Sequence, residues 1–181
     1  MSNISRAYFW GGCFWCVEAV FGRLEGVSEV HSGYMGGTTE NPTYDQVSMG
    51  RGWHIEVIEV IYDRDILAYE TLLAVFFATH DPTSIDRQWA DSGIQYRSVI
   101  FGSDDDLERA KDYIEKLDAD STFSSTIVTE LRWLCPFYRA EEYHQNYYND
   151  NSDKPYCSYV IDPKIAKLRE KFSKYLKKEM K

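Results

Sequence analysis

The sequence predicts an α+β fold in a single domain spanning residues 1–181. A chain of this length buries a sizeable core without disulfide staples. Some segments alternate apolar and polar residues with a period of two, as strands do, and others repeat them with a helical period. The strand-like and helix-like segments are interleaved along the chain rather than grouped, which favours one mixed layer structure over two separate domains.

The first part of the chain supplies three predicted strands and one helix. Residues 7–10 form a short buried strand that ends at a pair of glycines. A helix follows, with apolar residues at helical spacing: Val17, Val20, Phe21 and Leu24. Residues 26–37 predict a strand closed by glycines, and residues 54–63 alternate like a half-buried strand. Between these two strands, residues 37–53 form a loop rich in Gly, Pro and Asn.

The middle of the chain completes the order of predicted elements. Residues 68–80 predict a helix, residues 96–102 a strand, and residues 103–117 a helix that Ser103 caps, with acidic residues in its first turn. The order is therefore strand, helix, strand, strand, helix, strand. This is the order of a ferredoxin-like βαββαβ sandwich core, in which two helices cover one face of an antiparallel sheet.

C-terminal extensions follow this core. Residues 126–131 predict an added edge strand, and residues 136–148 are rich in aromatic side chains. Residues 149–163 are expected to form a mobile loop, and residues 165–180 an amphipathic helix.

Composition and charge exclude several functions. The net charge is −9, whereas a general nucleic-acid binder needs a basic face. From Lys164 onward, eight Lys or Arg accompany two Glu, and we interpret this basic tail as a solvated helix docked on an acidic body. A non-enzymatic protein that binds a partner through this tail is the alternative. No apolar run approaches the ~20 residues of a membrane span, and no signal peptide is evident, so we expect a cytoplasmic protein.

The four cysteines carry the main chemical signal: Cys13, Cys16, Cys135 and Cys157. A structural zinc site needs a second close pair of ligands, which the sequence lacks, so we expect no metal. A deaminase-type zinc site is excluded because the cysteine pair precedes the "HIE" segment. A thioredoxin-type disulfide exchanger remains open, since C-x-x-C between a strand and a helix is its signature. Two buried structural thiols are the remaining alternative.

Position favours Cys13 as the nucleophile of the pair. Unpaired N–H groups and the positive end of the helix dipole stabilise a thiolate at the first helical turn. We therefore expect the pKa of Cys13 to lie below its usual value. Cys16 lies about one turn further on, where the effect fades, and is a bystander or a reserve.

Seven segments of the chain occur together in one order: "GGCFWCVEAVFGRLEGVSEVHSGYMGG", "NPTYDQV", "HIEVIEVIYD", "THDPTS", "DSGIQYRSVIF", "FYRAEEYHQNYY" and "PYCSYVIDPK". From Phe9 to about Lys167, they resemble the peptide methionine sulfoxide reductase family, type A. The resemblance implies a ferredoxin-like core and reduction of the S epimer of methionine sulfoxide, free or in oxidised proteins. It also implies thioredoxin as external reductant and no bound cofactor. We expect a monomer.

The resemblance assigns the catalytic roles. Cys13 matches the attacking cysteine, and Phe14 and Trp15 match the aromatic pair that holds the S-methyl group of the substrate. Glu56 matches the acid that protonates the sulfoxide oxygen, because desolvation beside aromatic rings keeps a proton on a carboxyl near neutral pH. By pattern alone, an isolated glutamate in a strand is more often a solvated outward residue. Glu59 offers no substitute, since three positions along a strand reverse the face.

Further residues complete the implied site. Tyr44 and Tyr96 match two phenols that bind the sulfoxide oxygen, and Asp91 matches a carboxylate that shapes the same pocket. Taken singly, these residues would be an ordinary pair of tyrosines and a turn residue.

The resolving thiol has two candidates. Attack by Cys13 leaves a sulfenic acid, which a second thiol must clear. Cys157 occupies the place of a resolving cysteine in the resemblance and is favoured, with Cys16 as the rival because it is close in sequence. Cys135 has no counterpart and is taken as structural.

The chain departs from the usual pattern of the family at a few positions. Trp53 and Trp89 stand where the family commonly has glycine, and Arg64 stands where it commonly has proline. We expect the two tryptophans to affect substrate preference rather than the chemistry.

Overall fold

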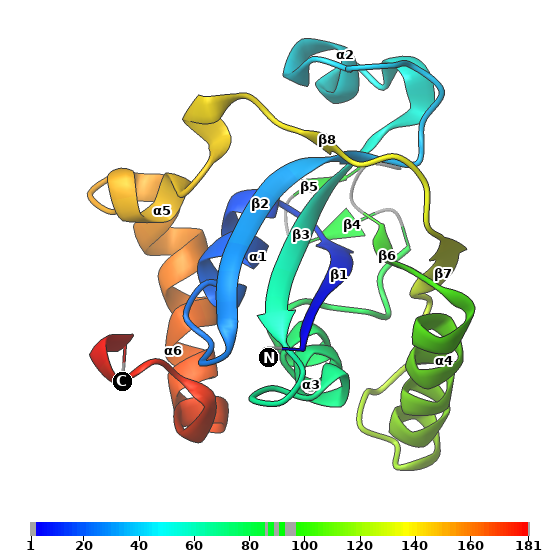
Figure 1. Ribbon diagram of the computed structural model, residues 1–181, viewed down its shortest axis with the longest axis vertical. Coiled ribbons are helices and arrows are strands. Elements are labelled where there is room, and N and C mark those ends of the chain that lie inside the picture. Colours follow the sequence, from blue (N-terminus) through cyan, green and yellow to red (C-terminus); the bar gives the residue numbers. More distant parts are fainter. Residues whose placement is uncertain (1–2, 86, 89–90, 93–96, 181) are drawn as a thin grey trace.

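The computed structural model describes residues 3–85, 87–88, 91–92 and 97–180 (Figure 1). Six strands form the central sheet: β1 (Ile4–Gly11), β2 (Val27–Met35), β3 (Ile55–Asp63), β6 (Ser98–Gly102), β7 (Glu130–Trp133) and β8 (Tyr138–Arg139). Their order across the sheet is β7-β6-β1-β3-β2-β8. The four central strands pair antiparallel, whereas β7 is parallel to β6. Two short strands, β4 (Arg87–Gln88) and β5 (Asp91–Ser92), pair separately.

Helices of very different length connect these strands. The α-helices are α1 (Phe14–Phe21), α2 (Tyr44–Ser48), α3 (Tyr69–Thr79), α4 (Asp104–Ala119), α5 (Tyr147–Asp150) and α6 (Asp162–Phe172). A π-helical turn, η4 (Cys157–Ile161), leads directly into α6. Short 3-10 turns are η1 (Arg51–Trp53), η3 (Glu142–His144), η5 (Ser173–Tyr175) and η6 (Lys178–Met180).

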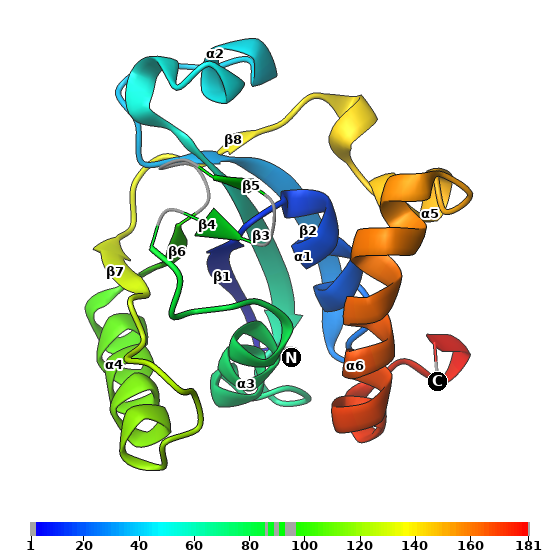
Figure 2. The same ribbon diagram turned by 180° about the vertical axis from the view of Figure 1, so that it is seen from behind.

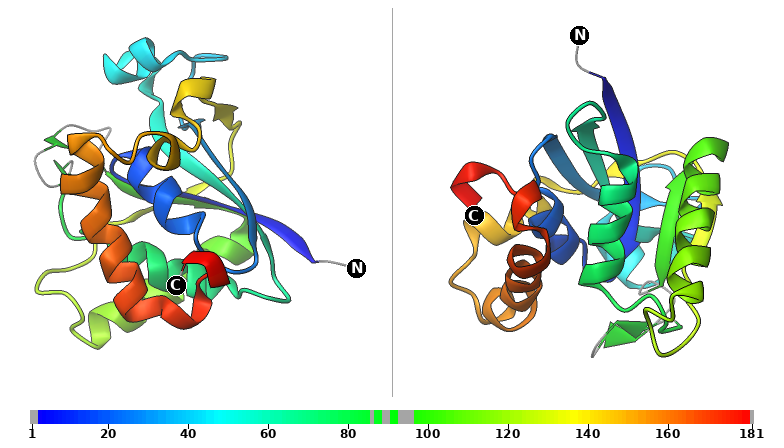
Figure 3. Two further views of the ribbon diagram at one scale, coloured as in Figure 1. Left: turned by 90° about the vertical axis from the view of Figure 1, so that its left-hand side faces the viewer. Right: turned by 90° about the horizontal axis from the view of Figure 1, so that it is seen from below.

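The sheet buries both of its faces. On one face, strand residues such as Phe9, Ile58 and Ile100 pack against apolar residues of α1, α3, α4 and α6. Figures 2 and 3 show α1 and α3 on this side, with α6 beside α1. The other face packs Trp10 and Val57 against Phe137 and its neighbours. Because strand side chains alternate between faces, each inner strand carries apolar residues on both sides.

The structure confirms the predicted α+β class and the order of the long elements. Ser103 caps α4 as predicted, in a reciprocal arrangement with Asp106. The predicted edge strand lies slightly later than expected, at β7. The helix α2 and the strand β8 were not predicted.

The predicted loop over residues 149–163 is wrong in its second half. Cys157, Ile161, Ile165 and Leu168 are buried and recur at helical spacing, so the chain is helical from η4 into α6. Because this apolar stripe packs on the rest of the fold, the Cys157 side chain is buried and belongs to a helical turn rather than to a mobile loop. The helix α6 also ends at Phe172, before the predicted end at residue 180.

Two findings concern the described residues as a whole. None of their helices has the length and apolar character needed to cross a membrane. Within the same residues, no group of three or more His, Cys, Asp or Glu side chains is arranged to hold a metal ion.

Candidate active site

Cys13 is the N-cap residue of α1. Its carbonyl accepts hydrogen bonds from the backbone N–H groups of Cys16 (3.1 Å) and Val17 (3.3 Å). Glycines make the turn that precedes it: Gly12 has φ +97°, which L side chains rarely adopt, and a Cβ at Gly11 would lie 3.0 Å from His80. The "GGC" run therefore delivers the Cys13 side chain to the start of a helix, as the sequence predicted.

The two thiols of α1 form a coupled pair. A hydrogen bond from Cys13 to the sulfur of Cys16, together with burial, raises the pKa of Cys13 well above its usual value. The same hydrogen bond lowers the pKa of Cys16. The prediction that Cys13 carries the lowered pKa is therefore wrong for this arrangement. The two thiols therefore titrate as one pair, in which the shared hydrogen bond disfavours the thiolate of Cys13 and favours that of Cys16.

Tyr156 was missed by the sequence analysis, although it stands directly before Cys157. Its hydroxyl lies 3.8 Å from the sulfur of Cys16 and also hydrogen-bonds to Cys13. Burial and the neighbouring sulfurs raise the pKa of Tyr156, so its phenol stays protonated and donates to the pair. The only sequence signal was its place in "KPYC".

Glu56 reaches the same helix start from the sheet. It is the second residue of β3, and its Oε2 accepts a hydrogen bond from the backbone N–H of Phe14 at 3.1 Å. Its carboxylate thus lies at the positive end of α1, at the residue that follows Cys13. The alternative of a solvated outward glutamate is excluded by this contact.

Phe14 and Trp15 form an immobilised aromatic wall. Phe14 is buried, with its ring centroid 5.0 Å from that of His144. The indole N–H of Trp15 donates to Nδ1 of His144 at 3.1 Å, and its ring stacks on Tyr147 at 3.7 Å with an interplanar angle of 7°. Both predicted wall residues therefore lie together, and His144 and Tyr147 are contributors that the sequence analysis missed.

Tyr44 joins this wall from α2. Its ring centroid lies 4.5 Å from that of His144. Its backbone N–H donates to Oε1 of Glu141 at 2.8 Å, while Oε2 of Glu141 accepts from the hydroxyl of Tyr34 at 2.8 Å. Glu141, another missed residue, therefore ties the start of α2 to β2.

Three predicted contributors lie wholly or partly outside the described part of the chain. Asp91 belongs to β5, where it pairs with Gln88, but its side chain lies outside the described part of the chain. Tyr96 and Trp89 lie outside the described residues.

All four cysteines are free thiols, and three of them gather in one apolar cluster. Cys157 is fully buried with Cys16, and Cys13 packs on the same cluster. Burial raises the pKa of Cys157, so it is held as a thiol. Cys135 packs on the opposite face of the sheet, beside Phe137.

Thiols at a helix start, faced by a carboxylate and an aromatic wall on an α+β scaffold, define a thiol-based enzyme. Its family is identified by similarity to known proteins. The family described as Peptide methionine sulfoxide reductase matches residues 5–176. The chain belongs to this family and has peptide methionine sulfoxide reductase activity.

Individual relatives agree with this assignment. The "Peptide methionine sulfoxide reductase MsrA" of Natronomonas pharaonis is 53% identical over 164 residues, which cover 90% of this chain and 92% of the relative. The protein of the same name from Chromobacterium violaceum is 49% identical, covering 96% and 99% of the two chains. Among solved structures, reduced Mxr1 from Saccharomyces cerevisiae has a TM-score of 0.77 at 29% identity, covering 86% and 90%. Methionine sulfoxide reductase A of Corynebacterium diphtheriae has a TM-score of 0.75 at 33% identity, covering 84% and 77%.

Proposed function

We propose that this reductase acts on the S epimer of methionine sulfoxide, free or in oxidised proteins, with Cys13 as the nucleophile. The observation that carries the proposal is the hydrogen bond between Glu56 and the N–H of Phe14. This contact brings a carboxyl group to the start of α1, where Cys13 is the N-cap residue. The contact therefore supports a nucleophile and an acid at the same helix start.

The proposed reaction moves one oxygen atom from the substrate to the enzyme. The Cys13 thiolate attacks the sulfoxide sulfur while Glu56 donates a proton to the sulfoxide oxygen, which makes that oxygen a better leaving group. A bond forms between the Cys13 sulfur and the substrate sulfur, the S–O bond breaks, and the protonated oxygen leaves as water. Water then attacks the Cys13 sulfur, the bond between the two sulfurs breaks, and methionine leaves. Cys13 is left as a sulfenic acid, so that one oxygen atom is transferred to the enzyme overall. Tyr44, Tyr96 and Asp91 are proposed to hold the oxygen during this step.

Phe14 and Trp15 are proposed to bind the S-methyl group. The stacking of Tyr147 on Trp15 and the hydrogen bond to His144 support this role, because they fix the plane of the indole ring. A rigid wall holds a small apolar group more selectively than a mobile one.

Cys157 is proposed to clear the sulfenic acid. Its thiol would displace water from the Cys13 sulfenic acid to give a disulfide, which thioredoxin then reduces. The shared apolar cluster supports Cys157, and the hydrogen bond between Cys13 and Cys16 supports the rival, Cys16. Mxr1 of yeast has been solved in complex with Trx2, which agrees with thioredoxin as the reductant.

Further proposals concern the fold, the oligomeric state, the location and the docking of peptides. The strand order β6-β1-β3-β2 supports a ferredoxin-like core. We propose that residues 1–181 act as a single, monomeric, cytoplasmic domain, and that the cycle uses no bound cofactor. Trp53 is 67% exposed and has φ +63°, and it is proposed to affect how peptides dock.

A single turnover tests the proposal. Reduced enzyme is mixed with resolved S- and R-methionine sulfoxide without reductant, and the methionine released and the disulfide formed are measured. We expect methionine from the S epimer alone and a Cys13–Cys157 bridge. A Cys13–Cys16 bridge would reassign the resolving thiol. No methionine from either epimer would favour a general disulfide exchanger instead.

A further inference from the structure

Lys164 is a buried lysine in the first turn of α6. It is only 8% exposed, and within the described residues it has no hydrogen bond or ion pair. Its Nζ is not one of the described buried nitrogens and oxygens that lack a hydrogen-bond partner, so the aliphatic part of the side chain is buried while the ammonium group reaches solvent. Its neighbour one turn further on, Lys167, is exposed to solvent.

The side chain of Lys164 lies beside Cys16. The two residues line one narrow gap between α1, α3 and α6, together with His80. Cys16 and Ile165, the residue after Lys164, also share one buried cluster. Cys16 is 1% exposed, so a nearby charge acts on it more strongly than on a thiol at the surface, and Lys164 lines both this gap and an open pocket beside it.

Among the described residues, Lys164 is the one positively charged side chain that lines this gap. His80 is neutral, because burial lowers its pKa to about 3. The phenol of Tyr156 and the thiols of Cys13 and Cys157 carry no positive charge. The carboxyl group of Glu56, on β3, opposes ionisation of Cys16.

We propose that Lys164 is a positioning residue that holds the negative charge of the thiol pair on Cys16, so that Cys16 takes the proton of Cys13 when Cys13 attacks. The proton moves along the hydrogen bond between the two sulfurs. Cys13 becomes the thiolate and Cys16 the neutral thiol, and no outside base is needed. The proton-transfer part rests on the proposed function, in which Cys13 is the nucleophile.

The charge on Cys16 can be measured directly. The full-length reduced protein is labelled with [3-¹³C]cysteine, and the Cβ signals are followed against pH, with assignment from Cys16→Ser and Cys157→Ser variants. We expect Cys16 to ionise before Cys13 in the wild type. In Lys164→Met, the Cys16 midpoint should rise by about one pH unit, which lowers its thiolate fraction about tenfold near neutral pH.

Two matched variants separate charge from packing. Lys164→Arg keeps the charge and should retain the wild-type midpoint, whereas Lys167→Met removes a charge from the same helix and should leave the midpoint unchanged. Circular dichroism checks that each variant folds. A Lys164→Met midpoint equal to the wild type, or ionisation of Cys13 before Cys16, would overturn the inference.

Single turnover then tests proton transfer separately. The rate of methionine release in Lys164→Met should fall about tenfold near neutral pH and recover at high pH, where solvent deprotonates Cys13. An equal loss at every pH would contradict the role of Lys164 in proton transfer. If the wild type releases no methionine, the proposed function fails, while the titration still decides where the charge lies.

Discussion

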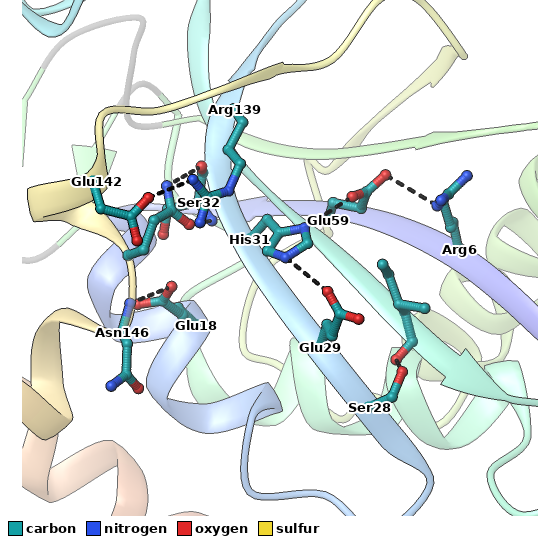
Figure 4. A network of polar contacts seen from close by, with 12 residues as sticks. Arg6, Glu18, Ser28, Glu29, His31, Ser32, Glu59, Arg139, Glu142 and Asn146 are labelled. Atoms are coloured by element: carbon teal, nitrogen blue, oxygen red, sulfur yellow. Dashed lines mark hydrogen bonds and ion pairs between the residues drawn. The ribbon is translucent and has the colours of Figure 1, made fainter.

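Glu56 and Glu59 show how the position of a carboxylate on a strand decides its role. They lie three residues apart on β3 and therefore on opposite faces of the sheet. Glu56 accepts a hydrogen bond at the start of α1. Glu59 lies on the other face, beside His31 and Arg6 (Figure 4), and it accepts a hydrogen bond from the hydroxyl of Tyr8. The two residues thus form a natural pair of test and control.

Replacing Glu56 by Gln should slow single-turnover release of methionine by roughly 10²- to 10⁴-fold, the usual contribution of a general acid. The fold should stay intact, because Gln keeps an oxygen that accepts the N–H of Phe14. Glu59→Gln should react at nearly the wild-type rate. A wild-type rate of turnover in Glu56→Gln would contradict the assignment of Glu56 as the acid.

Tyr156 allows a second test at this scale. Its phenol lowers the pKa of both thiols of the pair by donating hydrogen bonds to their sulfurs. In Tyr156→Phe, the thiolate absorbance near 240 nm should therefore appear at a pH about half a unit to one unit higher. Tyr159→Phe is the control, because Tyr159 is 82% exposed. Superimposable titration curves for Tyr156→Phe and the wild type would contradict this role.

Single residues were predictable where the local sequence fixes them. The glycine pair and the predicted helix start gave the position of Cys13 at the first turn of a helix. The alternation of side chains along a strand predicted that Glu56 and Glu59 lie on opposite faces of the sheet. The distribution of charge between Cys13 and Cys16 was predicted wrongly, because a hydrogen bond between buried sulfurs leaves no trace in the sequence. Tyr156 was missed for the same reason, since it reaches the thiols from far along the chain.

At the scale of elements, one buried carboxylate holds two helices together. Oε1 and Oε2 of Glu18, on α1, accept the backbone N–H groups of Asn146 (2.9 Å) and Tyr147 (3.2 Å), and Figure 4 shows the contact with Asn146. Asn146 has φ +52°, so the start of α5 is a tight turn. Since Tyr147 stacks on Trp15, Glu18 also fixes the aromatic wall.

Burial raises the pKa of Glu18 from 4.5 to about 7. The folded protein therefore holds this proton more tightly than the unfolded chain. The resulting stability is fully present below pH 4.5 and is lost as the pH rises through 7. Glu18→Gln lacks this titration, so its free energy of unfolding relative to the wild type should improve by up to about 3 kcal/mol between pH 4.5 and 8.

Urea unfolding of the wild type and Glu18→Gln across this range measures the difference. Glu108→Gln serves as a control, because Glu108 is exposed on α4. A difference between Glu18→Gln and the wild type that does not change with pH would show that Glu18 has an ordinary titration in the folded state.

The long elements were predictable because their periodicity extends over many residues, as in β3 and α4. The short ones were not. The strand β8 has two residues, and α2 has five and depends on a capping box between Thr43 and Gln46. The helical turn η4 was predicted as a loop because polar residues precede it. Its few apolar residues are recognisable as a buried helical face only once they are seen to pack on α1.

At the scale of the molecule, the fold brings the first helix of the chain against the turn that leads into α6. Cys13 and Cys16 lie on the first helix, and Cys157 lies on the turn that leads into the last α-helix, α6. All three contribute to one apolar cluster, although about 140 residues separate the first from the last. A disulfide between them would therefore close nearly the whole chain into a loop.

This loop length gives a test of the resolving thiol that needs no mapping of peptides. By chain entropy, a bridge from Cys13 to Cys157 should stabilise the protein by about 5 kcal/mol, and a bridge from Cys13 to Cys16 by less than about 2 kcal/mol. Urea unfolding of the protein before and after one turnover, without reductant, measures the gain. We expect a gain of several kcal/mol in the wild type and in Cys16→Ser, and a small one in Cys157→Ser. Equal gains in the wild type and Cys157→Ser would assign the bridge to Cys16, because only a short loop would then have been closed.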